Sequence, residues 1–276
     1  MTTPTADPLI VDSALAARLE RTEAIANSRF VEARKRVDPH SKAAWIEVGG
    51  TYAMFDGPDS PCTQTFGLGI SAEPQAAELQ AIETFFAERG AAVHHEVAPL
   101  ISPELIAILN QRHYHPIEFT NVLCRRIGSN VPMPTSRNAE LRVVAASSEE
   151  AELWAQTSAN GWAEHPEMMQ FILDLAQNFV LTQGVTAMFA KLDDRPIATG
   201  VVAIVEGVAL LAGASTIPDA RNQGAQSALL AKRLQFAVDQ GCDIAMMSAL
   251  PGSPSQRNAQ RNGFQIAYTR TKWKLS

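Results

Sequence analysis

The sequence VALLAGASTIPDARNQGAQSALLAKRLQFAVDQGCDIAMMSAL, residues 208–250, decides the fold. Apolar residues fill 208–216 and 243–250, which predicts two strands, and an amphipathic helical run lies between them. This helix opens with a polar loop, which reads Arg221-Asn222-Gln223-Gly224-Ala225-Gln226-Ser227. Free backbone N–H groups and the positive end of the helix dipole make such a start suitable for a phosphate or pyrophosphate group. We therefore interpret residues 221–227 as an anion-binding loop.

The elements around this loop make the interpretation more specific, because a glycine at a helix start is by itself also ordinary turn chemistry. The order strand, loop, helix, strand, helix resembles the cofactor-binding core of the GCN5-related N-acetyltransferases (GNAT), whose pyrophosphate loop reads Gln/Arg-x-x-Gly-x-Gly/Ala. Arg221 and Gly224 match its first and fourth positions, whereas Gln226 departs from the small residue at the sixth. The family's Gly-Phe pair is matched by Gly263-Phe264, so the resemblance covers roughly the last half of the chain.

The resemblance implies acetyl-CoA as co-substrate and an N-acetyltransferase that acts on a primary amine of a small-molecule or peptide acceptor. In that fold two parallel strands part and offer main-chain groups to the pantetheine arm, which corresponds here to residues around 214–216 and 247–248. The implied cofactor-binding residues are Ala214, Ser215, Thr216, Arg221, Asn222, Gln223, Gly224, Ala225, Gln226, Ser227, Ser255 and Asn258. Ser255 and Asn258 lie one turn apart on the last helix and are equally suited to be ordinary cap and surface residues.

The catalytic residues stay open. The family often has a tyrosine four residues before its Gly-Phe pair, and here that place is Ala259. Glu164 and His165 precede a predicted helix in the region where the resemblance places acceptor contacts, and they are either a catalytic base or a solvated helix start. The missing tyrosine leaves a second function open, an acyl-CoA-binding pseudoenzyme that acts as a sensor or scaffold.

The first half of the chain is similar to the second. A shift of 151 residues lays Gly90 on Gly241, and Ser102-Pro103 on Ser253-Pro254. The residues missing from the first half fall where the second half has its glycine loop. We therefore expect an α/β (α+β) protein with two tandem acyl-CoA N-acyltransferase-like domains, whose mixed central sheets are flanked by helices. Domain 1–135 lacks the pyrophosphate loop and domain 136–276 has it, with a linker at 128–136. Chance similarity between two strand-helix-strand-helix units is the alternative.

Periodicity and turn residues predict the individual elements. The expected helices cover 13–36, 74–89, 103–113, 147–157, 166–182, a run from the glycine loop to Gly241, and a run from Pro254 to the Gly-Phe pair. The expected strands cover 45–48, 51–55, 64–70, 92–100, 117–126, 141–146, 185–191, 196–205, 208–216, 243–250 and 265–275.

Charge restricts the function further. The 276 residues carry a net charge of −6, so we expect no general affinity for nucleic acid or for anionic membranes. From Arg221 onward there are eight Lys or Arg and two Asp, which leaves −12 on the first 220 residues. The basic residues near the end are either simply solvated or, in the case of Arg221, Arg257 and Arg261, help to hold a polyanion such as coenzyme A.

The expected compartment and the expected absence of a metal follow from patterns that the sequence does not contain. No stretch is apolar over the roughly 18 residues of a membrane span, and the chain does not begin with a signal-peptide pattern. Cys62, Cys124 and Cys242 are scattered without metal-ligand spacing, so we expect buried, reduced thiols and no metal. These features lead us to expect a cytoplasmic protein. We expect a monomer or a homodimer, and the sequence does not distinguish the two.

Overall fold

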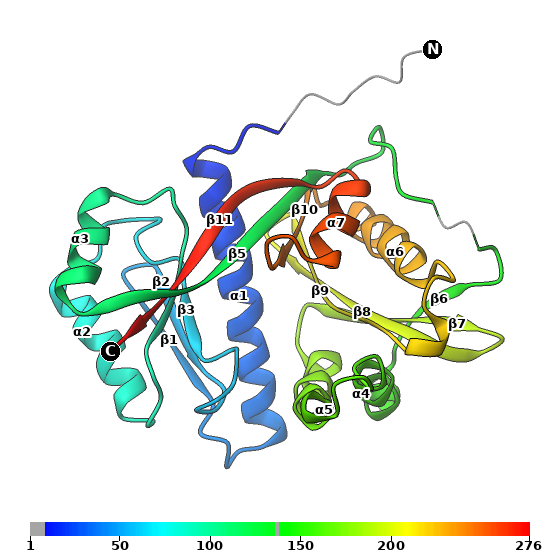
Figure 1. The fold of residues 1–276 in the computed structure, drawn as a ribbon, viewed down its shortest axis with the longest axis horizontal. Helices are drawn as coiled ribbons and strands as arrows, with labels where there is room; N and C mark the ends of the chain where they lie inside the picture. The colour runs from blue at the N-terminus through cyan, green and yellow to red at the C-terminus, as the bar shows by residue number, and fades with distance from the viewer. Residues whose placement is uncertain (1–8, 136–137) are drawn as a thin grey trace.

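The computed structural model describes residues 9–135 and 138–276, and Figure 1 shows their arrangement. The first half follows the predicted order of helices and strands. Its elements are α1 (Ser13–Val37), β1 (Ala44–Val48), β2 (Thr51–Phe55), β3 (Gln64–Phe66), α2 (Ala76–Ala87), β4 (His94–Val97), α3 (Pro103–Gln111) and β5 (Tyr114–Arg126). The strands predicted at 64–70 and 92–100 are shorter than expected. β3 ends at Phe66 because Gly67 and Gly69 adopt positive φ angles of 82° and 74°, which end a ladder.

The second half also follows the predicted order, with a short 3₁₀ turn before its first helix and another after β9. Its elements are β6 (Arg142–Ala145), η1 (Ser148–Glu150), α4 (Ala151–Asn160), α5 (Pro166–Leu181), β7 (Val185–Leu192), β8 (Arg195–Val205), β9 (Val208–Thr216), η2 (Pro218–Ala220), α6 (Ala225–Asp239), β10 (Ile244–Ala249), α7 (Pro254–Arg261) and β11 (Gln265–Leu275). The expected linker at 128–136 joins β5 to β6, and its last residue lies outside the described part of the chain.

The described strands form one continuous sheet, in the order β1-β2-β3-β4-β11-β5-β10-β9-β8-β7-β6. The pairs β3/β4 and β9/β10 are parallel, and the other neighbours are antiparallel. In the second half, α6 and α7 lie on one face of the sheet and α4 and α5 on the other (Figure 1). The predicted α/β fold with a mixed sheet flanked by helices is confirmed, and the sheets of the two halves are joined into one.

The two halves exchange strands at the centre of this sheet. β5, from the first half, lies between β10 and β11 and pairs with β10 from Asn121 to Arg126. β11, the last strand, lies between β4 and β5 and pairs with β4 from Thr271 to Lys274. The long antiparallel pair of β5 and β11 runs across the middle of the molecule (Figure 1). Each half is therefore completed by a strand of the other.

Helix α1 also connects the two halves. Asp12 caps it through a hydrogen bond of 2.8 Å from the Leu15 backbone N–H to its carboxylate, as predicted for the start of this helix. Its first turns pack on the central strands through a cluster that includes Leu15 and Leu19, and later turns contact β2 and β3. Near its end, the Phe30 ring lies 5.0 Å from the ring of Phe179 on α5. α1 thus passes between the halves and touches both (Figure 1).

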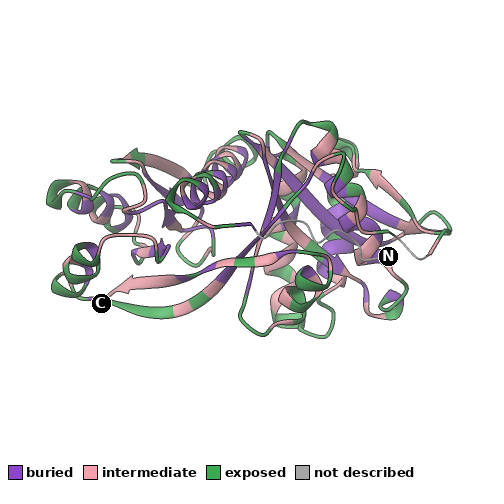
Figure 2. Ribbon diagram, turned by 90° about the horizontal axis from the view of Figure 1, so that it is seen from above, coloured by how far each residue is buried: buried purple, intermediate pink, exposed green. Residues whose placement is uncertain are grey.

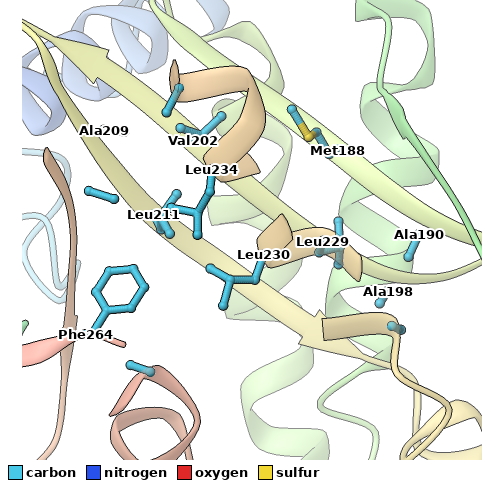
Figure 3. Close-up of a cluster of buried hydrophobic side chains, with 14 of the residues drawn as sticks. Met188, Ala190, Ala198, Val202, Ala209, Leu211, Leu229, Leu230, Leu234 and Phe264 are labelled. Atoms are coloured by element: carbon cyan, nitrogen blue, oxygen red, sulfur yellow. The ribbon is translucent and has the colours of Figure 1, made fainter. Parts of the chain in front are cut away.

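Buried residues concentrate on the strands and on the helix faces that cover them (Figure 2). In the second half, Leu229, Leu230 and Leu234 of α6 point toward the strands beneath, among them β8 and β9 (Figure 3). Phe264, the aromatic residue of the predicted Gly-Phe pair, belongs to the same cluster and is 3% exposed. This packing fixes the start of α6 relative to the ends of β9 and β10.

Equivalent turns of the two halves use the same types of residue. Gly90 follows α2 and Gly241 follows α6, with φ angles of 67° and 79°. Ser102 and Ser253 cap α3 and α7 through their side chains, each followed by a proline. The order β3-α2-β4-α3-β5 thus corresponds to β9-α6-β10-α7-β11.

A buried histidine in the first half makes the stability pH-dependent. His95 on β4 is fully buried, and its Nδ1 lies 2.7 Å from Thr65 Oγ1. Burial, with a smaller contribution from His94, lowers the pKa of His95 from 6.5 to about 3. The unfolded chain binds a proton near pH 6.5 that the folded chain does not bind, so the free energy of unfolding falls as the pH drops from about 6.5 toward 3. Between pH 7 and pH 5.5 we expect His95 to account for a loss of about 1 kcal/mol.

Chemical denaturation at these two pH values tests this expectation. The loss should be about 1 kcal/mol smaller in His95→Gln than in the wild type. His115→Gln, at an exposed histidine, is the matched control and should keep the full pH dependence. An unchanged dependence in His95→Gln would contradict the assignment.

Two further expectations concern the cysteines and the membrane. Cys62, Cys124 and Cys242 are all buried and unpaired, as predicted. Burial raises the pKa of Cys62 to about 12. Among the described residues, the helices include none with the length and apolar character that a membrane crossing requires.

Candidate functional site

The parallel strands β9 and β10 part at the centre of the second half. They pair only at Val208/Ile244, Ala209/Ala245 and Leu210/Met246. Beyond these pairs β9 continues along β8 as far as Thr216, and β10 continues along β5 as far as Ala249. The register of β9 on β8 shifts between Thr199 and Val201, so that two residues of β9 oppose one of β8. Such a bulge bends and twists a strand, which explains why β9 leaves β10. The parting implied by the family resemblance is thus present.

The predicted anion-binding loop lies between the end of β9 and the start of α6. Asn222 and Gly224 adopt left-handed φ angles of 64° and 87°, which turn the chain into the helix. Gly224 is the N-cap residue, and the first turn of α6 contains no acidic side chain. Within the described part of the chain, the backbone N–H groups from Gln223 to Ser227 have no hydrogen-bond acceptor. A helix start with free donors is the arrangement that binds phosphate groups.

Arg221 does not point into this cradle. Its Nη1 donates to Glu164 Oε2 at 2.6 Å, and its Nη2 donates to the carbonyl oxygen of Gly161 at 3.1 Å. Both partners belong to the connection between α4 and α5, and both charged side chains remain partly exposed, at 41% and 60%. The structure therefore places Arg221 between the predicted phosphate loop and the segment that the resemblance assigns to the acceptor.

Gln226 explains the departure from the family's small residue at the sixth loop position. Its side-chain amide donates to the carbonyl oxygen of Ser215 at 2.9 Å and to the Thr216 hydroxyl at 2.8 Å. The Ser215 hydroxyl in turn donates to the carbonyl oxygen of Ser158 at 2.8 Å. Ser215 is buried, and its hydroxyl and carbonyl groups are both hydrogen-bonded. Of the other two predicted β9 residues, Thr216 is half-buried and Ala214 is exposed. Gln226 ties the end of β9 to the start of α6.

The residues predicted on α7 lie apart from these contacts. Ser253, rather than Ser255, caps the helix, and Ser255 is exposed. Asn258 is half-buried, and its carbonyl oxygen accepts a hydrogen bond from Asn262 Nδ2 at 2.8 Å. Arg257 is exposed and donates to the carbonyl oxygen of Gly252. The structure gives these residues local roles on α7.

Ala259 occupies the place of the family's usual tyrosine and is 1% exposed. It belongs to the hydrophobic cluster of Phe264 and the α6 leucines. A tyrosine ring has no room there, since a small side chain in a packed core leaves no space for a large one. The general acid, if there is one, comes from another residue.

The acceptor-side candidates Glu164 and His165 are both exposed. Glu164 is paired with Arg221, and His165 Nδ1 lies 3.5 Å from Glu167 Oε1. His165 precedes α5 as its N-cap residue and makes no side-chain capping bond. These contacts fit the solvated helix start better than a base held in place.

Sequence reasoning missed a buried arginine behind the bulge. Arg233 of α6 is 4% exposed, and its Nη1 donates to the carbonyl oxygens of Val201 and Ala212 at 3.1 and 3.3 Å. Burial lowers its pKa to about 10, and no carboxylate of the described residues forms an ion pair with it. Gly200 is required at this point, because a Cβ there would lie 3.0 Å from the guanidinium carbon. Arg233 therefore donates to one carbonyl group of β8 and one of β9 next to the bulge.

Sequence reasoning also missed a carboxylate that α1 brings to the parting strands. Ser248, on β10 just beyond the last β9 pair, has its Oγ 3.3 Å from both carboxylate oxygens of Glu23. Arg270 of β11 donates to Glu23 at 2.8 Å and to Glu20 at 2.8 Å. Tyr268 donates its hydroxyl to Glu20 at 2.7 Å. The signal in the sequence is two acids at helical spacing i, i+3 beside Leu19, on the apolar side of the predicted first helix.

The equivalent helix start in the first half is occupied by the chain itself. α2 begins after Gln75, whose backbone N–H donates to the Glu78 carboxylate at 2.7 Å. The same carboxylate lies against Gly49, where an added Cβ would be 2.6 Å from Glu78 Oε1. A carboxylate of the protein therefore lies where α6 presents free N–H groups.

A metal centre finds no support in the side-chain arrangement. Within residues 9–135 and 138–276, no group of three or more His, Cys, Asp or Glu side chains is placed to hold a metal ion.

Solved structures share this fold over nearly the whole chain. The GCN5-related N-acetyltransferase from Kribbella flavida is 19% identical over 91% of this chain and 95% of that chain, with a TM-score of 0.63. A tandem GNAT protein from the clavulanic acid biosynthesis pathway is 12% identical over 98% of both chains, with a TM-score of 0.59. The GCN5-related N-acetyltransferase from Sphaerobacter thermophilus is 16% identical over 97% of this chain and 93% of that chain, with a TM-score of 0.54. Identities this low show the fold.

The sequence of the second half matches a family model. Residues 149–264 match the family described as Acetyltransferase (GNAT) family, and this part of the chain is a GNAT domain. A comparison with curated proteins found no match. The family resemblance carried by the 221–227 loop and Gly263-Phe264 is confirmed, and a domain of this family supports acyl-CoA-dependent N-acyltransferase activity.

Proposed function

We propose that the protein transfers an acetyl group from acetyl-CoA to a primary amine of a small-molecule or peptide acceptor. The observation that carries this proposal is the start of α6, where backbone N–H groups without acceptors among the described residues lie beside the parted strands β9 and β10. The pyrophosphate of coenzyme A would accept hydrogen bonds from residues 223–227 at the positive end of the helix. Gly224 leaves its N–H group open to close approach.

Other residues of the loop fit a phosphate in different ways. Arg221 is held by Glu164, and because both side chains are partly exposed, a phosphate could compete for the guanidinium. Gln226 holds the loop against β9 and leaves its own backbone N–H group free. The main-chain edges around 214–216 and 247–248 would take the pantetheine amides. Bound acetyl-CoA supplies a reactive thioester, and these groups of the chain orient it.

We further propose that the acceptor nitrogen, once its ammonium group has lost a proton, attacks the thioester carbonyl directly, so that the amide bond forms as the C–S bond breaks and coenzyme A leaves as the thiolate, without an acyl-enzyme. Cys242 is buried just before β10, at the opposite end of that strand from Ser248, and burial raises the pKa of its thiol. A protonated, buried thiol is a poor nucleophile. Ala259 supplies no acid, but a thiol with a pKa of about 8.5 leaves readily near neutral pH, so the reaction is slowed rather than blocked. The Ser248 hydroxyl is the side-chain group that β10 offers where the strands part.

Ala259 also supports the alternative function, an acyl-CoA-binding pseudoenzyme that acts as a sensor or scaffold. Its side chain is a methyl group packed in the core and supplies no hydroxyl that could protonate the leaving thiolate. Both functions need the same cofactor site, but only the transferase releases thiol from acetyl-CoA in the presence of an amine.

The experiment is to measure thiol release from acetyl-CoA with a panel of amines and amino acids, and to measure coenzyme A binding by calorimetry. Binding with amine-dependent thiol release supports the transferase. Binding without release over the background hydrolysis supports the pseudoenzyme, and absence of binding contradicts both. We expect one site per chain, because Glu78 occupies the corresponding helix start in the first half. Two equivalent sites would contradict that part of the proposal.

A further inference from the structure

The Glu23 carboxylate lies beside β10 at the point where β9 and β10 part, which we call the opening, although it belongs to the first half of the chain. Its side chain is 12% exposed, whereas Glu20, one turn earlier, is 1% exposed. Ser248, its neighbour on β10, is half-buried and lies two residues beyond the last pair with β9. Glu23 is thus the member of its network that reaches the opening.

The surrounding network keeps Glu23 in place from behind. Arg270 lies between the two glutamates, and its guanidinium carbon is 4.9 Å from the centre of the Phe66 ring. Tyr268 and Arg270 both donate to Glu20 Oε1, while Glu20 Oε2 is buried and has no hydrogen-bond partner among the described residues. A side chain held by a buried guanidinium keeps one orientation, which is what a binding residue requires.

Acidic groups outnumber basic ones in this region. Lys272 Nζ lies 3.2 Å from Glu96 and 3.8 Å from Glu118, next to the Arg270 network. Two cations therefore face four carboxylates, which belong to Glu20, Glu23, Glu96 and Glu118. Burial raises the pKa of Glu20 and of Glu96, so it is the partly exposed carboxylate of Glu23 that can attract a positively charged group. An amine acceptor is positively charged near neutral pH, because alkylammonium groups have a pKa of about 10.

We propose that Glu23 binds the ammonium group of the acceptor and that the first half of the chain thereby selects cationic amines for the site in the second half. The inference rests on the proposed function, because it assumes that coenzyme A lies between β9 and β10. It assigns to α1 a contact with the acceptor that the GNAT domain at 149–264 does not itself contain.

Two analogues of coenzyme A test this without knowledge of the natural acceptor. S-(2-aminoethyl)-CoA carries an ammonium group close to the sulfur, and S-propyl-CoA has the same shape without the charge. Calorimetry on the full chain should show that the wild type binds the aminoethyl analogue at least about tenfold more tightly, as one charge-assisted hydrogen bond provides. Glu23→Gln should bind both analogues equally and should bind coenzyme A itself like the wild type.

Two control variants separate the loss of the Glu23 contact from a general loss of negative charge or of stability. Glu206→Gln removes a carboxylate with the same formal charge as Glu23. The Glu206 side chain is 58% exposed and paired with Arg21, so this variant should keep the preference for the aminoethyl analogue. Glu23→Asp retains the charge and should keep part of the preference even if Glu23→Gln lowers the melting temperature. The proposal is overturned if the wild type binds both analogues equally, or if the preference survives in Glu23→Gln. If neither the analogues nor coenzyme A bind, the proposed function itself fails, and this outcome differs from binding without discrimination.

Discussion

Replacing Gly224 by aspartate is expected to weaken coenzyme A binding by about 100-fold, which corresponds to about 3 kcal/mol. The new carboxylate would lie at the start of α6, where it can accept the N–H groups that the pyrophosphate needs and repel the phosphates. The nearest atoms to a Cβ at this position are Asn138 Cβ at 3.8 Å and Leu141 Cδ1 at 3.9 Å, so a Cβ fits without a clash. The first half already shows this arrangement, since Glu78 caps α2. Calorimetry with coenzyme A measures the effect.

Gly241→Asp is the matched control, at the other end of the same helix. Gly241 has a φ angle of 79°, close to the 87° of Gly224, and nothing lies within 4 Å of an added Cβ. Both variants therefore carry the strain of a left-handed backbone, about 1 to 2 kcal/mol. Both should melt at a lower temperature, but only Gly224→Asp should lose affinity. Equal affinities of the two variants for coenzyme A would show that the α6 start is not the pyrophosphate site.

The second large effect concerns the connection between the halves. If a protease site is inserted between Ser129 and Asn130, which are exposed, cleavage should leave the two fragments bound to each other at micromolar concentration. β5 remains between β10 and β11, and it pairs with them at six and ten positions. Separation would break both ladders and expose the edges of β10 and β11. The fragments should elute together in gel filtration and separate only in denaturant.

Expression of each fragment alone completes this test. We expect both to be insoluble, because each lacks a strand from the middle of its sheet and α1 is lost from the second half. The uncleaved insertion variant is the control for the effect of the added residues. Fragments that elute separately in native buffer, or a soluble, folded fragment 130–276, would show that the exchanged strands are not required.

Much of the fold follows from local sequence. The β9-α6-β10 unit is predicted because apolar runs, Pro218 and Gly241 mark its boundaries, and the first hairpin is predicted because Gly49-Gly50 separates two strands. The exchange of β5 and β11 is not predicted. The side-chain pattern of a strand reflects the two faces of the sheet and does not record which strands pair with its two edges, so partner choice is absent from the local signal.

The candidate site, like the fold, is predicted from the sequence only in part. The α6 start lies within one short stretch of sequence, and the family pattern identifies it. Arg270 and Glu23 are 247 residues apart, and only tertiary structure brings them together. Arg221 was expected at the phosphate. Its pairing with Glu164 depends on where the α4–α5 connection lies in the folded protein, and residue spacing in the sequence does not predict that position.

The position of β11 has a consequence for synthesis on the ribosome. This strand, Gln265–Leu275, follows far along the chain from β5, which ends at Arg126, and yet it lies in the middle of the sheet and pairs with β4 and β5 of the first half. The N-terminal half therefore emerges from the exit tunnel long before its sheet has all its strands. Until β11 has emerged, β4 and β5 have unpaired edges, and nascent chains in this state are prone to aggregate and to recruit chaperones. Loop closure over such a distance also makes folding slow.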